Sequence, residues 1–473
     1  MRRLSKFYRE NVALLDKELR VNESFDLLKK VMKIGNDEIT LYYIDGFVKD
    51  GVMEKLMIYF LSLDGLGETS EDSADKFLIS HLPYVEAEVT EDFDNMIQMM
   101  LSGATLMLGS SFEDKAILID SRSYPARETQ EPENDRVMRG ARDGFVETLI
   151  ANTALIRRRI RDTALTMTYI SVGKRTKTDI ALCYLADKAD PEYVDYLKEK
   201  LKNIDTGSLT LGHQSLTECL IKTRWYNPFP KIRNTERPDA AVAQILEGSV
   251  IILCDNSPEA MILPTTIFDF MQETNDFYYP PLTGSYLRLV RHIVFWSTLI
   301  LTPVWYLLIK NPEIVPNWAN FVLPASQAKI PIIVQLLLVE FFLDGLKLAS
   351  MNTPSMLANS LSIVGGLILG DFAVDVGWLL PEVILYMAYI SIATFTQTSF
   401  ELGYAFKFLR VITLILTALF NYWGFGAGLL LTLILICTNK TANRRRSYLY
   451  PLIPFNGKAL LGLYIRLKRS SKT

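Results

Sequence analysis

The chain has 473 residues, which suffices for roughly two to four domains, and its formal charge is −3. Its four cysteines lie far apart without a CxxC pair, and the patterns GxxxxGK(S/T), HExxH and GxSxG are absent. This excludes a disulfide framework, a common zinc site and the commonest nucleotide-binding and hydrolytic sites. We therefore expect a protein of a reducing compartment that is not an enzyme, with no catalytic residue, no metal ligand and no cofactor.

The distribution of charge divides the sequence near residue 290. Residues 1–291 carry 36 basic and 46 acidic side chains, a formal charge of −10, whereas residues 292–473 carry 14 basic and 7 acidic side chains, a formal charge of +7. The first 20 residues are charged and lack an apolar core, so we expect no secretory signal peptide and a cytoplasmic first region. The acidic balance of that region argues against nucleic acid as a partner.

The first region alternates between strand and helix patterns. Short β-branched runs bounded by Gly, Asp or Pro predict strands at Ile39–Asp45, Ala116–Ser121, Asp179–Ala186, Ser249–Asp255 and Ala260–Pro264. Helices are predicted between them at Val52–Leu63, Phe145–Ile160 and Pro191–Leu201. The alternation indicates a cytoplasmic α/β region. We divide it into subdomains 1–170 and 171–290 at the basic turn Ser171–Thr178.

A run of arginines ends the predicted helix Phe145–Ile160. Its members are Arg157, Arg158, Arg159 and Arg161. Cations are favourable at a helix C-terminus, so a solvated cluster is the simplest interpretation. The alternative is a subunit contact, in which these arginines meet an acidic loop such as Glu131–Asp135.

Residues 291–438 are predicted to form an α-helical multi-pass transmembrane domain. His292–Ile309 has 18 residues without Asp, Glu, Lys or Arg, close to the ~20 residues that span a bilayer. Pro331–Leu348 is a weaker candidate because it contains three charged residues. Further full spans are predicted at Met356–Asp371, Glu382–Thr398 and Val411–Cys437.

Positive charges predict the orientation of these spans. Arg288 and Arg291 precede the first span and the tail 439–473 is basic, so both ends are expected in the cytoplasm and the number of crossings is even. Four full spans plus one partial helix meet this condition, and five or six spans are the alternative. The partial helix is Pro331–Leu348, whose acids are costly at mid-bilayer, or Val411–Cys437, which is broken at Asn421–Gly424. The tail is expected to contact anionic lipid.

Acidic residues within the apolar segments are the candidate functional residues. Glu340 and Asp344 are four residues apart, and Asp371 and Asp375 have the same spacing, so each pair shares one face of a continuous helix. A charge at a helix centre costs about 2.5–3.5 kcal/mol on insertion scales, so such groups face protein or water. We interpret Glu340 and Asp344 as inward-facing or pore-facing, and Asn359 as pore-lining or interhelical. Asp371 and Asp375 belong either to a cation path or to an interfacial loop.

The run Gly424–Gly428 (GFGAG) superficially resembles a phosphate-binding loop. It lies within an apolar stretch and no strand of a soluble domain precedes it. Close approach of two helices through small residues explains the pattern better.

Four long segments of the chain stand in a fixed order: Ile119–Asp162 (IDSRSYPARETQEPENDRVMRGARDGFVETLIANTALIRRRIRD), Phe229–Pro258 (FPKIRNTERPDAAVAQILEGSVIILCDNSP), Asp276–Arg291 (DFYYPPLTGSYLRLVR) and Ser447–Phe455 (SYLYPLIPF). These segments resemble the A subunits of spore germinant receptors, the GerA family of endospore-forming bacteria. The resemblance covers nearly the whole chain from about Ile39. Where receptor A subunits usually have a Glu-rich pattern ending in an REA-like triplet, this chain has Asp344-Gly345-Leu346 and so departs from the nutrient-sensing members.

The resemblance implies a protein of the spore inner membrane that forms an oligomeric, ring-like ion channel. It also implies cation release during germination and association with other small integral membrane subunits. Our hypothesis is a homo-oligomeric cation channel that amplifies ion release. Two alternatives stay open: a nutrient-sensing receptor A subunit, and a non-conducting membrane scaffold for germination proteins.

Overall fold

The computed structural model of the chain consists of two compact units. The N-terminal unit comprises Met1–Thr223 and Ile232–Pro264, and the helical unit comprises Arg224–Lys231 and Thr265–Thr473. The boundary in the chain therefore falls at residue 264 and not near residue 290. The structure describes residues 3–21, 23–67, 69–70, 72–84, 86–121, 141–207, 209, 212–221, 224–273, 276, 278–352, 365–366, 372–439, 441 and 447–466.

Aromatic packing explains why the helical unit includes residues that precede its first long helix. The rings of Phe229 and Phe406 meet edge-on with centroids 5.9 Å apart, and Tyr448 lies in the same core. The Tyr448 hydroxyl donates a hydrogen bond to the Pro230 carbonyl over 2.8 Å, and the Tyr448 carbonyl accepts one from the Ile267 amide over 3.0 Å. These contacts bind residues 224–231 and the chain after residue 264 to the helices.

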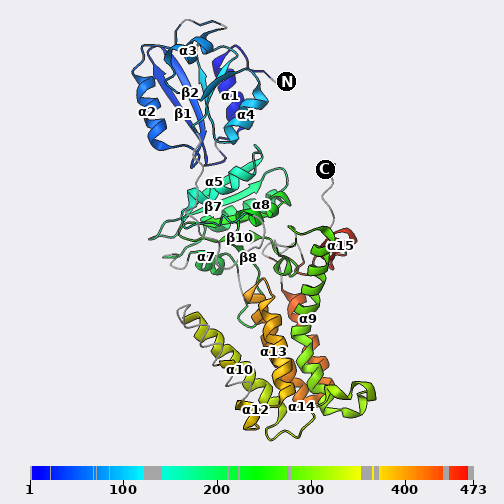
Figure 1. Cartoon of the computed structure of the whole chain (residues 1–473). Helices are drawn as coiled ribbons and strands as arrows, with labels where there is room; N and C mark the ends of the chain where they lie inside the picture. The colour runs from blue at the N-terminus through cyan, green and yellow to red at the C-terminus, as the bar shows by residue number, and fades with distance from the viewer. Residues whose placement is uncertain are drawn as a thin grey trace. The chain divides into compact units, whose positions relative to one another are not determined.

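The first half of the N-terminal unit is an antiparallel sheet between two helical layers. Its strand order is β1-β2-β4-β5-β3. Neighbouring residues of β4, Leu106 and Met107, point into different cores, which α1 and α4 cover on one face and α2 and α3 on the other (Figure 1). The elements are α1 (Tyr8–Glu18), β1 (Leu27–Ile34), β2 (Asp37–Ile44), α2 (Asp50–Leu61), α3 (Ser73–His81), β3 (Ala87–Thr90), α4 (Phe93–Leu101), β4 (Thr105–Gly109) and β5 (Ala116–Ile119).

The second half contains a second antiparallel sheet, with the order β6-β7-β9-β10-β8. Helices α5 and α8 share an apolar core with residues of β6, β7, β9 and β10. The α/β prediction is confirmed, with sheets that are antiparallel in the described residues. The elements are α5 (Leu149–Arg159), β6 (Leu165–Val172), β7 (Thr178–Leu185), α6 (Pro191–Lys202), α7 (His213–Leu220), β8 (Arg233–Thr235), α8 (Pro238–Leu246), β9 (Val250–Cys254) and β10 (Ala260–Leu263).

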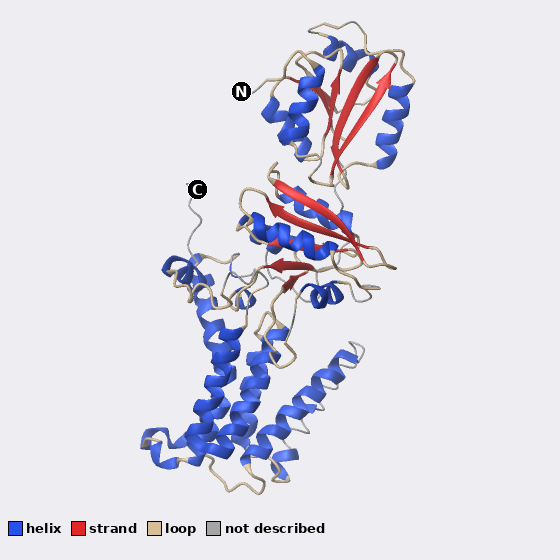
Figure 2. Ribbon diagram, turned by 180° about the vertical axis from the view of Figure 1, so that it is seen from behind, coloured by secondary structure: helices blue, strands red, loops and turns tan. Residues whose placement is uncertain are grey.

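The two halves repeat one arrangement. Each half has a helix, two strands, two helices, one strand, one helix and two strands in sequence, and each pairs its strands in the same spatial order (Figure 2). The final helix of each half is followed by a glycine, Gly103 or Gly248, with φ of 105° or 93°. Glycine is favoured there because only glycine adopts this region without steric cost.

The basic turn Ser171–Thr178 lies inside the second half. It closes the hairpin of β6 and β7, in which Val172 pairs with Thr178. Gly173 in this turn has φ of 94°, which suits a tight reversal. The division between the halves therefore lies before α5, and the subdomain boundary predicted at 170–171 falls within one sheet.

The helical unit has four main helices, counted over the described residues. Two of them, α9 and α14, are long and apolar enough to cross a membrane. The predicted spans at His292–Ile309, Pro331–Leu348 and Glu382–Thr398 lie largely within α9, α10 and α13, and Met356–Asp371 lies outside the described residues except for Gly365 and Gly366. The elements are η1 (Asp269–Met271), α9 (Pro281–Lys310), η3 (Pro312–Ile314), η4 (Asn317–Val322), α10 (Ile332–Asn352), α12 (Ala373–Asp375), α13 (Pro381–Phe395), α14 (Phe400–Thr438) and α15 (Gly457–Tyr464).

Helix α14 turns back on itself at Asn421. This residue has φ 51° and ψ −127°, outside the helical region, which confirms the predicted break. A Cβ atom on Gly424 would lie 1.8 Å from the Leu416 carbonyl oxygen, and one on Gly428 would lie 2.5 Å from the Thr413 hydroxyl. The two arms therefore pack antiparallel with their backbones in close contact, as the small-residue interpretation of GFGAG predicts.

The directions of the helices follow from their side-chain contacts. Phe295 of α9 contacts Phe406 of α14, and Asn311, which caps the end of α9, binds Asn421. The contacts follow the same order along both helices, so α9 is parallel to the first arm of α14. In contrast, α10 runs antiparallel to that arm, and α13 runs parallel to α10 (Figure 1).

Candidate functional site

The candidate site lies where α10, α13 and α14 meet. Helix α10 contributes Glu340, Asp344 and Lys347, which are spaced by four and three residues and so share one face. The first arm of α14 contributes Lys407 and Arg410, which have the matching spacing of three. Because the two helices are antiparallel, each acidic residue of α10 meets a basic residue of α14. These five residues are called the charged cluster below.

Both acidic residues of the charged cluster are paired with cations. The Arg410 Nε donates to Glu340 Oε1 over 2.9 Å, and the Arg410 Nη2 donates to the same oxygen. Lys407 Nζ lies 3.3 Å from Glu340 Oε2 and also contacts Asp344 Oδ1. A third donor of Arg410, Nη1, binds the Thr298 carbonyl of α9 over 2.9 Å. The cluster thus joins three helices.

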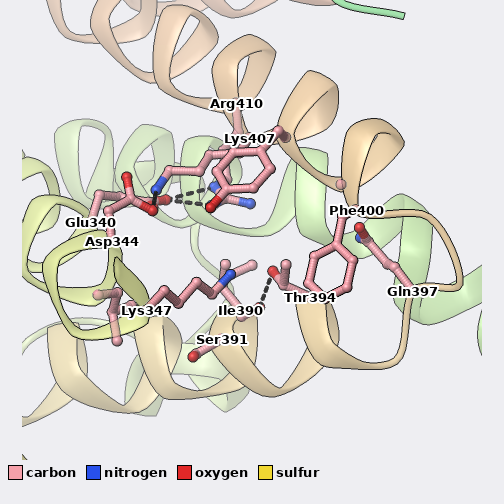
Figure 3. Close-up of a pocket in the computed structure, with 13 residues that line it drawn as sticks. Glu340, Asp344, Lys347, Ile390, Ser391, Thr394, Gln397, Phe400, Lys407 and Arg410 are labelled. Carbon is pink, nitrogen blue, oxygen red and sulfur yellow. Dashed lines mark hydrogen bonds and ion pairs between the residues drawn. The ribbon is translucent and has the colours of Figure 1, made fainter. Parts of the chain in front are cut away.

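Lys347 supplies a further positive charge. Its ammonium lies 5.2 Å from the centroid of the Phe395 ring and 5.7 Å from that of Tyr404, and Figure 3 shows it apart from the ion-paired groups. Such cation–π contacts stabilise by about 0.5–2 kcal/mol. With two acidic and three basic residues, the formal charge of the cluster is +1. The sequence prediction of an acid-lined path therefore changes, because the carboxylates are matched by cations in this structure.

The charged cluster lines a small pocket. Its volume is about 30 Å³, which is room for one or two water molecules. Helix α13 adds the polar side chains of Ser391 and Thr394 to the lining, and Gln397, just after the helix, adds another (Figure 3). Glu340 and Arg410 are almost fully buried, whereas the Asp344 side chain keeps 36% of its surface exposed. The pocket is therefore lined by polar groups, of which Asp344 is more exposed than Glu340 and Arg410.

Of the other predicted residues of this region, the structure describes Asp375. Asp375 is exposed in the short helix α12, outside the charged cluster, and both interpretations of this residue stay predictions. Asn359 and Asp371 lie outside the described residues. The prediction for these two residues stays untested.

The arginine run of α5 has a different role at each position. Arg157 is fully buried and binds Asp26 through Nε and Nη2, over 2.9 and 3.1 Å. Its Nη2 also donates to the Leu165 carbonyl over 3.0 Å. Arg157 thus joins the two halves of the N-terminal unit internally and has no surface for a subunit contact. Arg159 pairs with Asp143.

Arg158 and Arg161 are exposed. The subunit-contact prediction therefore remains for these two residues.

Sequence reasoning missed the basic half of the charged cluster. Lys407 and Arg410 stand just before the apolar run at Val411 and resemble flanking topology signals. The available signal was their spacing of three residues, which complements the spacing of Glu340 and Asp344. Their pairing spans about 70 residues of sequence and could not be assigned without the helix directions.

The chain is similar in sequence to proteins of sporulation and spore germination. Residues 15–473 match the family described as Bacillus/Clostridium GerA spore germination protein. The chain is 37% identical to stage V sporulation protein AF of Bacillus subtilis (strain 168), over 94% of this chain and 89% of that protein. It is 26% identical to spore germination protein KA of the same organism, over 97% of this chain and 84% of that protein.

One solved structure is also similar. It is the N-terminal domain of the A subunit of the Bacillus megaterium spore germinant receptor GerK3, with a TM-score of 0.40 and 22% sequence identity. The match covers 55% of this chain and 96% of that structure.

Proposed function

Since the chain belongs to the GerA family of spore germination membrane proteins, which are not enzymes, we propose that it conducts ions across the spore inner membrane during germination. In this proposal it forms a homo-oligomeric ring and amplifies cation release. Other small integral membrane subunits accompany it, and its basic tail contacts anionic lipid.

The charged cluster is the observation that carries the proposal. Five ionisable side chains lie between apolar helices whose outward residues, such as Leu385, Ile392 and Leu433, are exposed apolar groups suited to lipid. Charges at membrane depth are expensive and generally mark ion paths or relays. A purely structural helix contact would be achieved at lower cost by apolar side chains.

Cation passage requires the ion pairs to open. In the described state Lys407 and Arg410 neutralise Glu340 and Asp344, so a cation that enters meets no free carboxylate. A movement of α10 away from α14 would release both acids at once, because both are carried by α10. We therefore assign the described arrangement to a closed state.

The experiment is the double substitution Glu340→Gln with Asp344→Asn in the native gene. We expect potassium efflux from germinating spores to fall to the level of spores that lack the gene, with normal protein levels. Glu313→Gln is the matched control, since Glu313 is an exposed acid of η3 outside the cluster and should leave efflux unchanged. Normal efflux from the double variant at normal protein level would remove the acids from the mechanism.

Deletion of the gene separates this proposal from a nutrient receptor. An amplifying channel slows germination with every nutrient, whereas a receptor A subunit loses the response to one nutrient. The departure from the receptor pattern at Asp344-Gly345-Leu346 favours the first outcome.

A further inference from the structure

Polar and apolar residues are sorted to opposite ends of the helices around the pocket. On α10 the apolar Leu336 and Val339 come first, and Glu340, Asp344 and Lys347 follow. On α13, which runs parallel to α10, the order is the same: Val383 and Met387 come before Ser391 and Thr394, and Gln397 follows the end of the helix.

On the antiparallel arm of α14 the order is reversed. Lys407 and Arg410 precede the buried Leu414. On α9, parallel to that arm, the Thr298 carbonyl binds Arg410, and Trp305 lies further along. Among the residues that line the pocket and the apolar core beside it, the charged and polar groups therefore lie toward the end where α9 begins. Further along α14, the buried Thr413 and Thr417 donate hydrogen bonds to carbonyls of their own helix.

The apolar end is closely packed. We call the side chains of Trp305, Leu336, Val339, Val383, Met387 and Leu414 the apolar layer, and each has at most 5% of its surface exposed. Trp305 stacks on Tyr386 with ring centroids 4.3 Å apart. Beyond the layer, the Gln335 side chain accepts a hydrogen bond from the Leu380 amide over 2.8 Å. Water has no polar partner within such a layer.

We infer that the pocket is an aqueous vestibule that admits water and small ions from the end where α9 begins, and that the apolar layer closes it at the other end. The partly exposed Asp344 lies at its opening, and the Glu340–Arg410 pair forms its floor. Hydrophobic constrictions of this kind block ions by excluding water. The role of the layer as a gate rests on the proposed ion conduction, whereas the one-sided access does not.

Substituted cysteines on α13 test the access directly. The background lacks the exposed Cys219 and Cys437 and keeps Cys183 and Cys254. Burial raises the pKa of the Cys183 thiol, and it raises the pKa of Cys254 to about 12, so both stay protonated and unreactive at neutral pH. Full-length protein in membrane vesicles is treated from one side at a time with Ag⁺, a thiol-binding cation small enough for a pocket of about 30 Å³, and the thiols left free are counted after denaturation.

The expected result is a pattern along one helix. Ser391→Cys and Thr394→Cys should react at least on the order of tenfold faster than Val383→Cys and Met387→Cys, because the reagent needs a hydrated thiolate. The reaction should occur only from the side that carries the N-terminal unit. Ile392→Cys is the matched control: its side chain is exposed but faces lipid, so it should react as slowly as the layer positions.

Equal reactivity at 383, 387, 391 and 394, or reaction from the opposite side, would overturn the inference. A second variant, Leu336→Ser, opens the layer and should make Met387→Cys reactive, and continued protection there would also contradict the inference.

This experiment can be distinguished from the test of the proposed function. If liposomes show no flux although 391 and 394 react selectively, conduction fails and the vestibule stands. If flux occurs although all four positions react equally, the vestibule fails and conduction stands.

Discussion

Glu340 and Asp344 show what residue spacing can predict. Their four-residue separation indicates a shared face, and the cost of a charge in lipid indicates that this face is turned inward. Their partners, Lys407 and Arg410, depend on the relative direction of α10 and α14, which no local pattern encodes. From the sequence, Lys347 only weakens the prediction of a span at Pro331–Leu348, although in the structure it belongs to the charged cluster.

Arg157 illustrates the same limit in the N-terminal unit. A cationic run at the end of α5 predicts a solvated cluster, and this interpretation fits the exposed Arg158 and Arg161. Arg157 differs because its carboxylate partner, Asp26, is 131 residues away in the sequence. Of the arginines in this run, Arg157 is the one that is fully buried and makes a structural contact with Asp26.

Replacement of Arg157 should loosen the junction between the two halves. In the Arg157→Met variant the buried Asp26 loses its cation, which typically costs about 3–5 kcal/mol. Hydrogen exchange of the Phe25 amide, which donates to the Met167 carbonyl over 2.9 Å, should accelerate on the order of 10²–10³-fold in the full-length protein. Arg161→Met, at an exposed position of the same run, should leave this exchange unchanged. Equal exchange in both variants would refute the assigned role.

At the scale of elements, five strands and the helices α2, α5 and α6 were predictable from the pattern of apolar residues, whereas the fully buried β4 and the amphipathic α4 were missed. The β-branched runs of β2, β5, β7, β9 and β10 were found within two residues at each end. β1 (LLKKVMKI) was missed because its lysines interrupt the apolar pattern, as this strand has only one neighbour, at the sheet edge. The repeat of the two halves was also missed, because equivalent strands resemble each other in which positions are buried and less in which amino acids occupy them. The glycines after α4 and α8 were its clearest signal.

Two glycines of the α14 hairpin should respond differently to replacement by alanine, one with a loss of stability and the other without. Gly424→Ala places a methyl group against the Leu416 carbonyl and should destabilise the protein by about 1–3 kcal/mol or more. Gly426→Ala meets no atom within 4 Å and removes a flexible residue from a helix, so its effect should be neutral or slightly stabilising. Heating of the detergent-purified protein followed by size-exclusion chromatography measures both. A Gly424→Ala protein as heat-resistant as Gly426→Ala would contradict the close packing.

For the whole molecule, composition separated an α/β region from the apolar helices, but it placed the boundary at the start of the apolar sequence. The true boundary lies earlier because residues 224–231 and 265–280 belong to the helical unit. The described helices α10 and α13 are parallel, and if both span a membrane this requires an odd number of crossings between them. The predicted span Met356–Asp371 would supply one. Six crossings, with the two arms of α14 counted separately, then agree with the proposed cytoplasmic location of both termini.

The most direct measurement of the central claim is ion flux through the purified full-length protein in liposomes. The account predicts potassium flux above that of protein-free liposomes, its loss in the variant with Glu340→Gln and Asp344→Asn, and its retention in Glu313→Gln. Flux indistinguishable from protein-free liposomes, from wild-type protein that remains folded and oriented in the bilayer, would contradict conduction and favour a scaffold.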